Sequence, residues 1–156
     1  MQLDDAERGF SYSHPAPLDM RMDQSRGITA YEIVNSYEPG KLVHILRTYG
    51  EEKFATRIVE NIVKARGKKP LESTIELATL VKESIPAATR RTGGNPAKRT
   101  FQALRIEAND ELGAISRAIP QALDLLMVRG RLVVMSFQSL EDRIVKEIFK
   151  IGRAHV

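Results

Sequence analysis

Apolar residues recur along most of the chain with the spacing of an amphipathic α-helix. Phe54, Ile58 and Ile62 follow one another at every fourth position, and a valine follows each of the last two. This stripe predicts a helix of roughly four turns with one apolar face. Residues 67–70 begin with a glycine and end with a proline, so the helix is expected to end there.

Residues that favour helix ends bracket several other apolar runs. Thr29 and Ser73 each precede a glutamate by three positions, which is the spacing of a capping box. Pro39 suits the first turn of one helix, and Pro86 suits the end of another. Helices are therefore expected between Thr29 and Pro86, after an irregular stretch over residues 1–27.

The chain between Pro86 and Gly130 is predicted to form a loop and then a long amphipathic helix. Residues 87–95 contain two adjacent glycines and are predicted as the loop. Asn95 is expected to cap the helix, because its short side chain can accept a hydrogen bond from the first turn. Pro120 is expected to break this helix or to open a new one.

Residues 131–137, with a continuous apolar run over 132–135 at their centre, are the one convincing strand pattern in the sequence. It predicts a strand buried on both faces, followed by a final helix that Ser139 and Asp142 would cap. A buried strand needs neighbours on both edges to satisfy its backbone, and no other segment offers one. The chain is therefore predicted to be a mostly α-helical part of an α/β protein, with the rest of the sheet absent from it.

Residues 151–156 (IGRAHV) show no relation to the helix before them. The codons ATC GGA AGA GCA CAC GTC encode this stretch, and they resemble a common sequencing-adapter read. We therefore expect residues 151–156 to be a non-native tail and the chain to be truncated at both ends. A natural C-terminus is the alternative.

Composition limits the chemistry that the chain can carry. Of its 156 residues, 42% are hydrophobic and 28% are charged, as in ordinary soluble domains, and none is cysteine. Disulfides, thiolate metal sites and cysteine nucleophiles are thereby excluded. The sequence has no apolar run long enough to span a bilayer and no visible secretory signal, so a cytoplasmic protein is expected.

The net charge of +4 permits an anionic partner. Residues 89–105 carry five basic residues and no acidic one, and residues 64–69 carry four basic residues. Such runs are usually solvated surfaces, and charge alone favours that interpretation. The other interpretation is a surface that binds phosphate groups.

Few residues form a pattern that is typical of catalysis. The three histidines are scattered and make no metal-ligand set, so no metal site is predicted. Asp19 and Asp23 could act as paired carboxylates in acid–base chemistry. They could equally cap turns or pair with Arg21, which is the commoner case.

Four stretches of the chain carry a further signal: QLDDAERGF at Gln2–Phe10, PLDMRMD at Pro17–Asp23, NPAKRTFQALRI at Asn95–Ile106 and SFQSLEDRIVK at Ser136–Lys146. In this order and spacing they resemble the ribosomal small-subunit methyltransferase H family. That family transfers a methyl group from S-adenosylmethionine to the exocyclic N4 of a cytidine in 16S ribosomal RNA. The resemblance implies that the whole protein has the same enzymatic activity. This truncated chain alone is expected to be inactive.

The resemblance also implies a fold, which is a class I, Rossmann-like methyltransferase domain interrupted by an all-helical insertion. Residues 1–5 would end the N-terminal methyltransferase part, residues 6–100 would form the insertion that recognises RNA, and residues 101–150 would return to the methyltransferase part. The implied partner is 16S ribosomal RNA or the small ribosomal subunit during ribosome biogenesis in the cytoplasm, with no membrane. A homodimer is left open.

The same resemblance implies site residues. Gln2 would contact S-adenosylmethionine. The catalytic residues stay unassigned, with Asp19, Asp23, Ser136 and Gln138 as candidates. The RNA-binding candidates are the basic residues Arg21, Arg90, Arg91, Lys98, Arg99 and Arg105.

Two positions depart from the family pattern, which often has histidine at Asn95 and at Gln138. Asparagine can still cap a helix. Glutamine at position 138 puts any histidine-dependent proton transfer in question, although its amide still donates and accepts hydrogen bonds. Two other functions remain open: a non-enzymatic RNA-binding helical module, which the basic residues 89–105 favour, and an inactive fragment.

Overall fold

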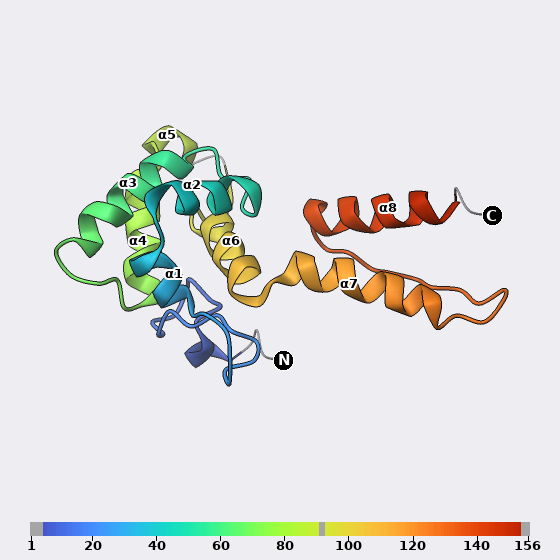
Figure 1. Ribbon diagram of the computed structural model, residues 1–156. Coiled ribbons are helices and arrows are strands. Elements are labelled where there is room, and N and C mark those ends of the chain that lie inside the picture. The colour runs from blue at the N-terminus through green and yellow to red at the C-terminus, as the bar shows by residue number, and fades with distance from the viewer. Residues whose placement is uncertain (1–4, 91–92, 154–156) are drawn as a thin grey trace. The chain divides into compact units, whose positions relative to one another are not determined.

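The computed structural model describes residues 5–90 and 93–153, and most of these are helical (Figure 1). The elements in chain order are the short 3-10 helix η2 (Ala6–Arg8) and the α-helices α1 (Ala30–Ser36), α2 (Pro39–Thr48), α3 (Ala55–Arg66), α4 (Thr74–Ser84), α5 (Ala87–Arg90), α6 (Lys98–Asn109), α7 (Glu111–Asp124) and α8 (Ser139–Arg153). Within the described ranges, none of these helices has the length and apolarity needed to cross a lipid bilayer.

The chain divides into two compact units, of which the first ends at Asn109 and the second begins at Asp110. Each unit is described by itself. The assignment of residues 1–5, 6–100 and 101–150 to parts of a methyltransferase stays a prediction.

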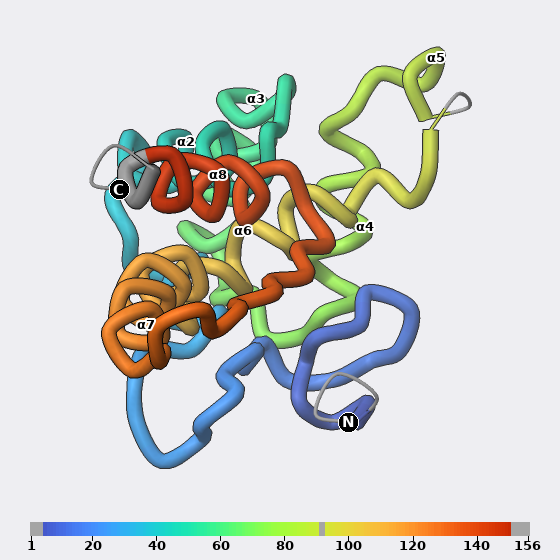
Figure 2. The backbone as a smooth tube through the Cα atoms, turned by 90° about the vertical axis from the view of Figure 1, so that its right-hand side faces the viewer, coloured from blue at the N-terminus to red at the C-terminus, as the bar shows by residue number. Residues whose placement is uncertain are grey.

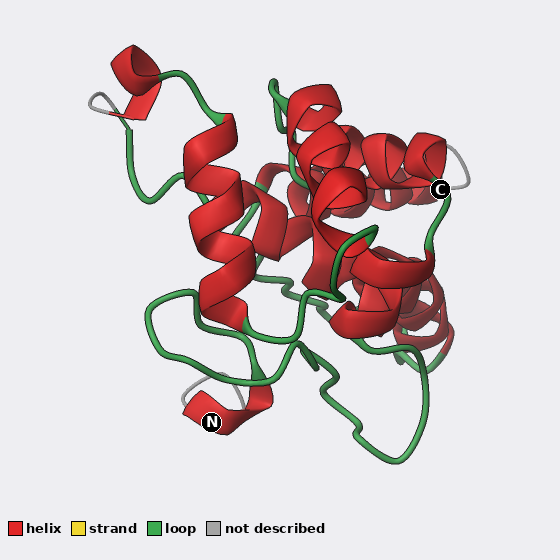
Figure 3. Cartoon of the chain, turned by 90° about the vertical axis from the view of Figure 1, so that its left-hand side faces the viewer, coloured by secondary structure: helices red, strands yellow, loops and turns green. Residues whose placement is uncertain are grey.

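Helices of the first unit pack around one apolar core. Helix α2 contacts α3 and α6, α3 also contacts α4, and α1 contacts α3 and α6. Figure 3 shows the helices in red and the loops that connect them in green. The predicted stripe of α3 is confirmed, because Ile58 and Ile62 are buried in this core. Other fully buried side chains of the core are Ile33, Leu42, Leu46, Leu77 and Leu104.

Both predicted capping boxes form. The hydroxyl of Thr29 accepts the N–H of Glu32 at 3.1 Å, and the carboxylate of Glu32 accepts the N–H of Thr29 at 2.8 Å. Ser73 and Glu76 make the same two bonds at 3.2 and 3.4 Å. These bonds satisfy N–H groups that the first turn of a helix leaves unpaired, so α1 and α4 begin where the sequence predicts. Pro39 is the first residue of α2, as expected.

Residues 9–28 form an irregular loop that is attached to the helices of the first unit. Leu18 and Met20 belong to the core and are 2% and 0% exposed. An antiparallel β-bridge joins Pro17 to Ser73, next to the start of α4. Figure 2 shows this loop in blue as it passes the segment that leads into α4. The irregular conformation is therefore held by tertiary contacts.

The prediction of a loop over residues 87–95 is wrong in part, because helix α5 lies within it. The carbonyl of Pro86 accepts the N–H groups of both Thr89 and Arg90 at 3.0 and 3.2 Å. Pro86 therefore opens a helical turn after ending α4. Asn95 acts close to its predicted position, since its side chain accepts the N–H of Ala97 at 2.9 Å, just before α6.

The long amphipathic helix breaks at Asp110 and not at Pro120. Asp110 has φ 47° and ψ 45°, a left-handed conformation that separates α6 from α7. Pro120 lies inside α7 on an exposed face. A proline removes one helical hydrogen bond, and at an exposed position water can hydrate the carbonyl left without its donor.

The prediction of a strand buried on both faces over residues 131–137 is wrong for the described part of the chain. The segment has no strand partner there and follows α7 back toward α8 (Figure 1). Leu132 and Val134 are half-buried, whereas Val133, Met135 and Phe137 are 89%, 78% and 88% exposed. A strand exists only when a second strand pairs with its backbone, and no described residue supplies one.

Helix α8 starts at the predicted Ser139, and the carbonyl of Gln138 accepts the N–H of Asp142 at 3.1 Å. Asp142 itself forms an ion pair with Lys146 at 2.6 Å, one turn later. The helix continues to Arg153, and residues 154–156 lie outside the described residues. The non-native origin of residues 151–156 stays a prediction.

Candidate functional site

Asp19 and Arg21 form a two-point ion pair in the loop of the first unit. The Nε of Arg21 lies 2.6 Å from Oδ1 of Asp19, and its Nη2 lies 3.1 Å from Oδ2. The side-chain amide of Gln24 donates to Oδ2 as well, at 3.3 Å. The hydrogen bond from Arg21 lowers the pKa of Asp19 below its ordinary value of 3.8. Asp19 is therefore a charged hydrogen-bond acceptor at neutral pH and a weak proton acceptor.

Asp23 is also held in its charged form. The hydroxyl and the N–H of Ser25 donate to its Oδ1 at 2.6 and 3.0 Å, and the Nε of Arg26 lies 2.8 Å from Oδ2. The hydrogen bonds from Ser25 lower the pKa of Asp23. Of the two alternatives left open by the sequence, the geometry of Asp19 and Asp23 matches turn capping and ion pairing. Their catalytic role stays a prediction.

The backbone of this loop is fixed by residues outside it. The Nη2 of Arg8 donates to the carbonyls of Arg21 and Met22 at 2.9 and 2.6 Å, and the carbonyl of Arg8 accepts the N–H of Met20 at 2.9 Å. Gly9 permits this approach, because its φ is 76° and a Cβ there would lie 2.2 Å from the carbonyl oxygen of Pro17. The loop can therefore present its carboxylates in a defined arrangement.

Sequence reasoning missed two residues that hold the loop, Arg8 and Asn109. The side chain of Asn109 bonds the backbone of Met20 and Met22. Arg8 lies inside one of the four resembling stretches, which could have drawn attention to it. Asn109 gave no local signal, because its partners lie 87 and 89 residues away along the chain.

Ser136 and Gln138, the other two catalytic candidates, lie in the second unit. Ser136 is half-buried. The Nε2 of Gln138 donates to Glu141 at 3.1 Å, and the other carboxylate oxygen of Glu141 accepts the N–H of Phe137 at 3.0 Å. The Oε1 of Gln138 is buried and has no partner among the described residues. The four catalytic candidates are thus divided between the two units.

The RNA-binding candidates differ in how far their side chains are already engaged. Arg21 is bound to Asp19, and the Nε of Arg90 donates to the carbonyl of Ile85 at 2.7 Å. Arg105 is half-buried in α6. Arg91 and Gln2 lie outside the described residues. Arg21, Arg90 and Arg105 are half-buried, which leaves fewer of the predicted cations exposed to meet phosphate.

Lys98 and Arg99 are exposed at the start of α6. This part of α6 lies against the end of α2, since the Nη1 of Arg99 donates to the carbonyl of Glu51 at 2.5 Å and the Nε2 of Gln102 donates to that of Tyr49 at 2.8 Å. The cations contributed by this neighbouring corner, which the sequence analysis did not select, are Arg47, Lys53 and Arg57. The start of α6 is thus bonded to the α2–α3 corner, and both carry exposed cations.

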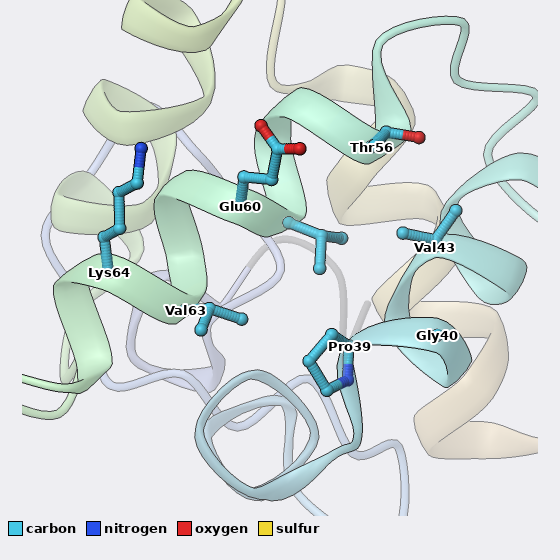
Figure 4. A pocket seen from close by; sticks show the side chains of 8 residues that line it. Pro39, Gly40, Val43, Thr56, Glu60, Val63 and Lys64 are labelled. Atoms are coloured by element: carbon cyan, nitrogen blue, oxygen red, sulfur yellow. The ribbon is translucent and has the colours of Figure 1, made fainter.

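An apolar pocket of about 370 Å³ lies between α2 and α3 (Figure 4). Its apolar lining includes Pro39, Val43 and Val63, and Glu60 and Lys64 also border it. None of the predicted site residues that the structure describes lines this pocket. Ligand sites usually combine an apolar lining with a few polar groups that orient the ligand, so this pocket does not account for the predicted chemistry.

The MraW methylase family matches residues 1–155. The chain belongs to the MraW methylase family. The predicted resemblance is therefore confirmed over nearly the whole chain, and the family implies a methyltransferase fold. Of the predicted architecture, the predominance of helices is confirmed, and the strand over residues 131–137 is not found.

Curated relatives of this MraW methylase chain carry the name ribosomal RNA small subunit methyltransferase H. The relative from Streptomyces avermitilis is 58% identical over 154 residues, which are 99% of this chain and 48% of that protein. Those from Renibacterium salmoninarum and Limosilactobacillus fermentum are each 59% identical, over 97% and 96% of this chain and 46% and 48% of the relative. The chain thus spans about half the length of the curated relatives that it matches.

Proposed function

We propose that this chain is part of an enzyme that uses S-adenosylmethionine to methylate the exocyclic N4 of a cytidine in 16S ribosomal RNA. The observation that carries the proposal is the likeness, over almost the whole chain, to relatives named ribosomal RNA small subunit methyltransferase H. The cofactor, the N4 position and a cytoplasmic site of action come from the resemblance of the four sequence stretches.

The first unit is proposed to bind the RNA. The proposed cationic surface combines exposed Lys98 and Arg99 with the cations of the α2–α3 corner, and hydrogen bonds from α6 to the carbonyls of Tyr49 and Glu51 hold α6 against the residues that follow α2. Cations in such an arrangement bind the RNA backbone through phosphate groups. The target cytidine must be unpaired or turned out of its helix to reach a methyl donor.

The loop over residues 17–23 is proposed to orient the target amine. Cytosine N4 is a weak nucleophile because its lone pair is delocalised into the ring, so alignment supplies much of the rate enhancement. Asp19 and Asp23 are held as charged acceptors, and carboxylates of this kind can accept the N–H groups of the amine as positive charge develops on it. Their lowered pKa values make them electrostatic partners of the amine, and the proton would leave to water.

The described residues are compatible with a cofactor site in the second unit. The buried Oε1 of Gln138 is a hydrogen-bond acceptor without a partner among the described residues, and an amino or hydroxyl group of S-adenosylmethionine could donate to it. Gln2 is proposed as a cofactor contact from the sequence resemblance alone. When bound, this cofactor supplies an electrophilic methyl group on a sulfonium ion.

The non-helical residues 131–137 are proposed to become a strand of a Rossmann-like sheet. Val133, Met135 and Phe137 are largely exposed and would lie on one face of a sheet, where a helix layer would cover them while neighbouring strands pair with the backbone. The curated relatives contain about as much sequence again as this chain matches. The other strands are proposed to come from that additional sequence.

The RNA-binding part of the proposal can be tested on the chain itself. The double variant Lys98→Ala, Arg99→Ala should bind a 16S ribosomal RNA fragment more weakly, and the slope of log affinity against log salt should fall by about one for each lost phosphate contact. The matched control, Lys82→Ala with Lys150→Ala, removes the same charge from exposed positions of α4 and α8, outside both basic runs. Equal losses of RNA affinity and equal changes of the salt slope in the two double variants would contradict the proposed surface.

Methyl transfer is tested in a chimera in which this chain replaces its matching segment in the Streptomyces avermitilis relative. We expect the chimera to form N4-methylcytidine in 16S ribosomal RNA when S-adenosylmethionine is supplied, as detected by mass spectrometry of nucleosides. If the unaltered relative forms this nucleoside and a folded chimera that binds RNA does not, the chain is an RNA-binding module without the proposed catalytic role.

A further inference from the structure

The side chain of Asn109, the last residue of α6, bridges the backbone of the loop that carries Asp19 and Asp23. Its Oδ1 accepts the N–H of Met22 at 2.7 Å, and its Nδ2 donates to the carbonyl of Met20 at 2.8 Å. The same Nδ2 donates to the carbonyl of Arg105, one turn earlier in α6, at 2.9 Å. Asn109 is therefore bonded to its own helix and to the loop at once.

This bridge reproduces the pairing that a neighbouring β-strand would provide. The amide offers one acceptor and one donor to the N–H and the carbonyl on either side of Arg21. The loop needs such support, because Met20 has φ 62°, a left-handed conformation that is unfavourable for a residue with a side chain. Arg21, whose backbone is fixed in this way, makes the two-point ion pair with Asp19.

A second asparagine in the first unit makes an equivalent bridge elsewhere. Asn35, near the end of α1, accepts the N–H of Leu71 through Oδ1 and donates through Nδ2 to the carbonyls of Leu71 and Tyr31, all at 2.9 Å. Tyr31 lies one turn earlier in α1, as Arg105 does in α6. Asn35 thus provides the same hydrogen bonds to a segment that carries none of the catalytic candidates.

We infer that Asn109 is a positioning residue for methyl transfer, which acts by holding the loop so that Asp19 and Asp23 meet the target amine. This inference rests on the proposed function. The end of α6 then has a role beyond packing, because the hydrogen bonds of Asn109 fix the two peptide groups that flank Arg21. Asn35 fixes the segment that leads into α4. This segment meets the loop at Pro17, through the bridge to Ser73, and not at the peptide groups that flank Arg21.

The first test follows the loop in the chain itself by amide hydrogen exchange. Asn109→Ala should raise the exchange rate of the Met22 amide about tenfold, because the N–H loses its acceptor, while the Leu71 amide stays protected. Asn35→Ala should give the reverse pattern. Unchanged exchange at Met22 in a folded Asn109→Ala variant would overturn the inference.

The second test measures methyl transfer in the chimera. Asn109→Ala should lower kcat about 100-fold, the effect of misplacing catalytic groups by about an ångström, and leave KM for RNA unchanged. Asn109→Asp keeps the size of the side chain but presents lone pairs to the carbonyls of Met20 and Arg105, so it should lower kcat at least as much. Asn35→Ala should leave kcat within about twofold.

The outcomes separate the two proposals. If the unsubstituted chimera transfers no methyl group, the proposed function fails while the exchange result at Met22 still stands. If the chimera is active and loosening of the loop by Asn109→Ala leaves kcat unchanged, or if Asn35→Ala lowers kcat equally, the positioning role of Asn109 is wrong.

Discussion

The loop over residues 17–23 and the segment over residues 131–137 are both apolar-rich stretches without helix, and they differ in what surrounds them. In the loop, Leu18 and Met20 are 2% and 0% exposed. In the segment, Val133 and Phe137 are 89% and 88% exposed. The loop is fixed by side chains of the same unit, whereas the segment has no strand partner among the described residues. Apolar content alone therefore does not decide whether a non-helical stretch is ordered by its neighbours.

The largest difference between the two regions is expected in stability. Leu18→Ala removes a buried side chain and should lower the free energy of unfolding by about 2–5 kcal/mol. Val133→Ser, at a largely exposed position, should change it by about 0.5 kcal/mol or less in the same chain. Urea denaturation followed by circular dichroism measures both. Similar losses of unfolding free energy in the two variants would contradict the view that the loop is packed and the segment is not.

A smaller difference is expected in the response to acid. The pKa of Asp19 is lower in the folded protein than its ordinary value of 3.8, so folding favours its charged form. Its contribution to stability is present above about pH 4 and is lost as the pH falls through the folded-state pKa. The side chains of Arg21 and Asp19 are only 19% and 16% exposed, so the loss of this charged hydrogen-bonded pair in Asp19→Asn should cost about 1 kcal/mol at pH 7.

The acid response is measured by comparing the unfolding free energies of Asp19→Asn and the unsubstituted protein between pH 7 and pH 2. The difference between them should shrink below pH 4 and vanish at the acidic end. Residues 131–137 contain no carboxylate, so Val133→Ser should show no such pH dependence. A difference for Asp19→Asn that persists at pH 2 would mean that the charge of Asp19 is not its source.

Local signals were sufficient for the starts of α1 and α4 and for the apolar stripe of α3. Thr29 and Ser73 start α1 and α4 through bonds made within four residues, and the stripe of α3 needs only its own periodicity. The break at Asp110 could not be predicted in this way, because its left-handed conformation leaves no mark in the apolar pattern. Pro120 gave a misleading signal, since an exposed proline can stay within a helix.

The candidate site was predictable only where its contacts join residues that are close in the sequence. The pairing of Asp19 with Arg21 joins residues two positions apart and was among the alternatives. The bridge from Asn109 joins residues 87 positions apart, and only the folded chain brings them together. The strand pattern over residues 131–137 predicted a sheet. That prediction holds only if the partner strands lie in sequence outside this chain.

Residues 131–137 are proposed to form a strand once partner strands are present. Amide hydrogen exchange of these residues gives the most direct test of this proposal, when this chain alone is compared with the Streptomyces avermitilis chimera. We predict rapid amide exchange in the chain alone and at least 100-fold slower exchange in the chimera, where partner strands would bond these N–H groups. The loop amides of Met20 and Met22 should exchange equally slowly in both. Rapid exchange of residues 131–137 in a folded chimera would contradict their place in a methyltransferase sheet.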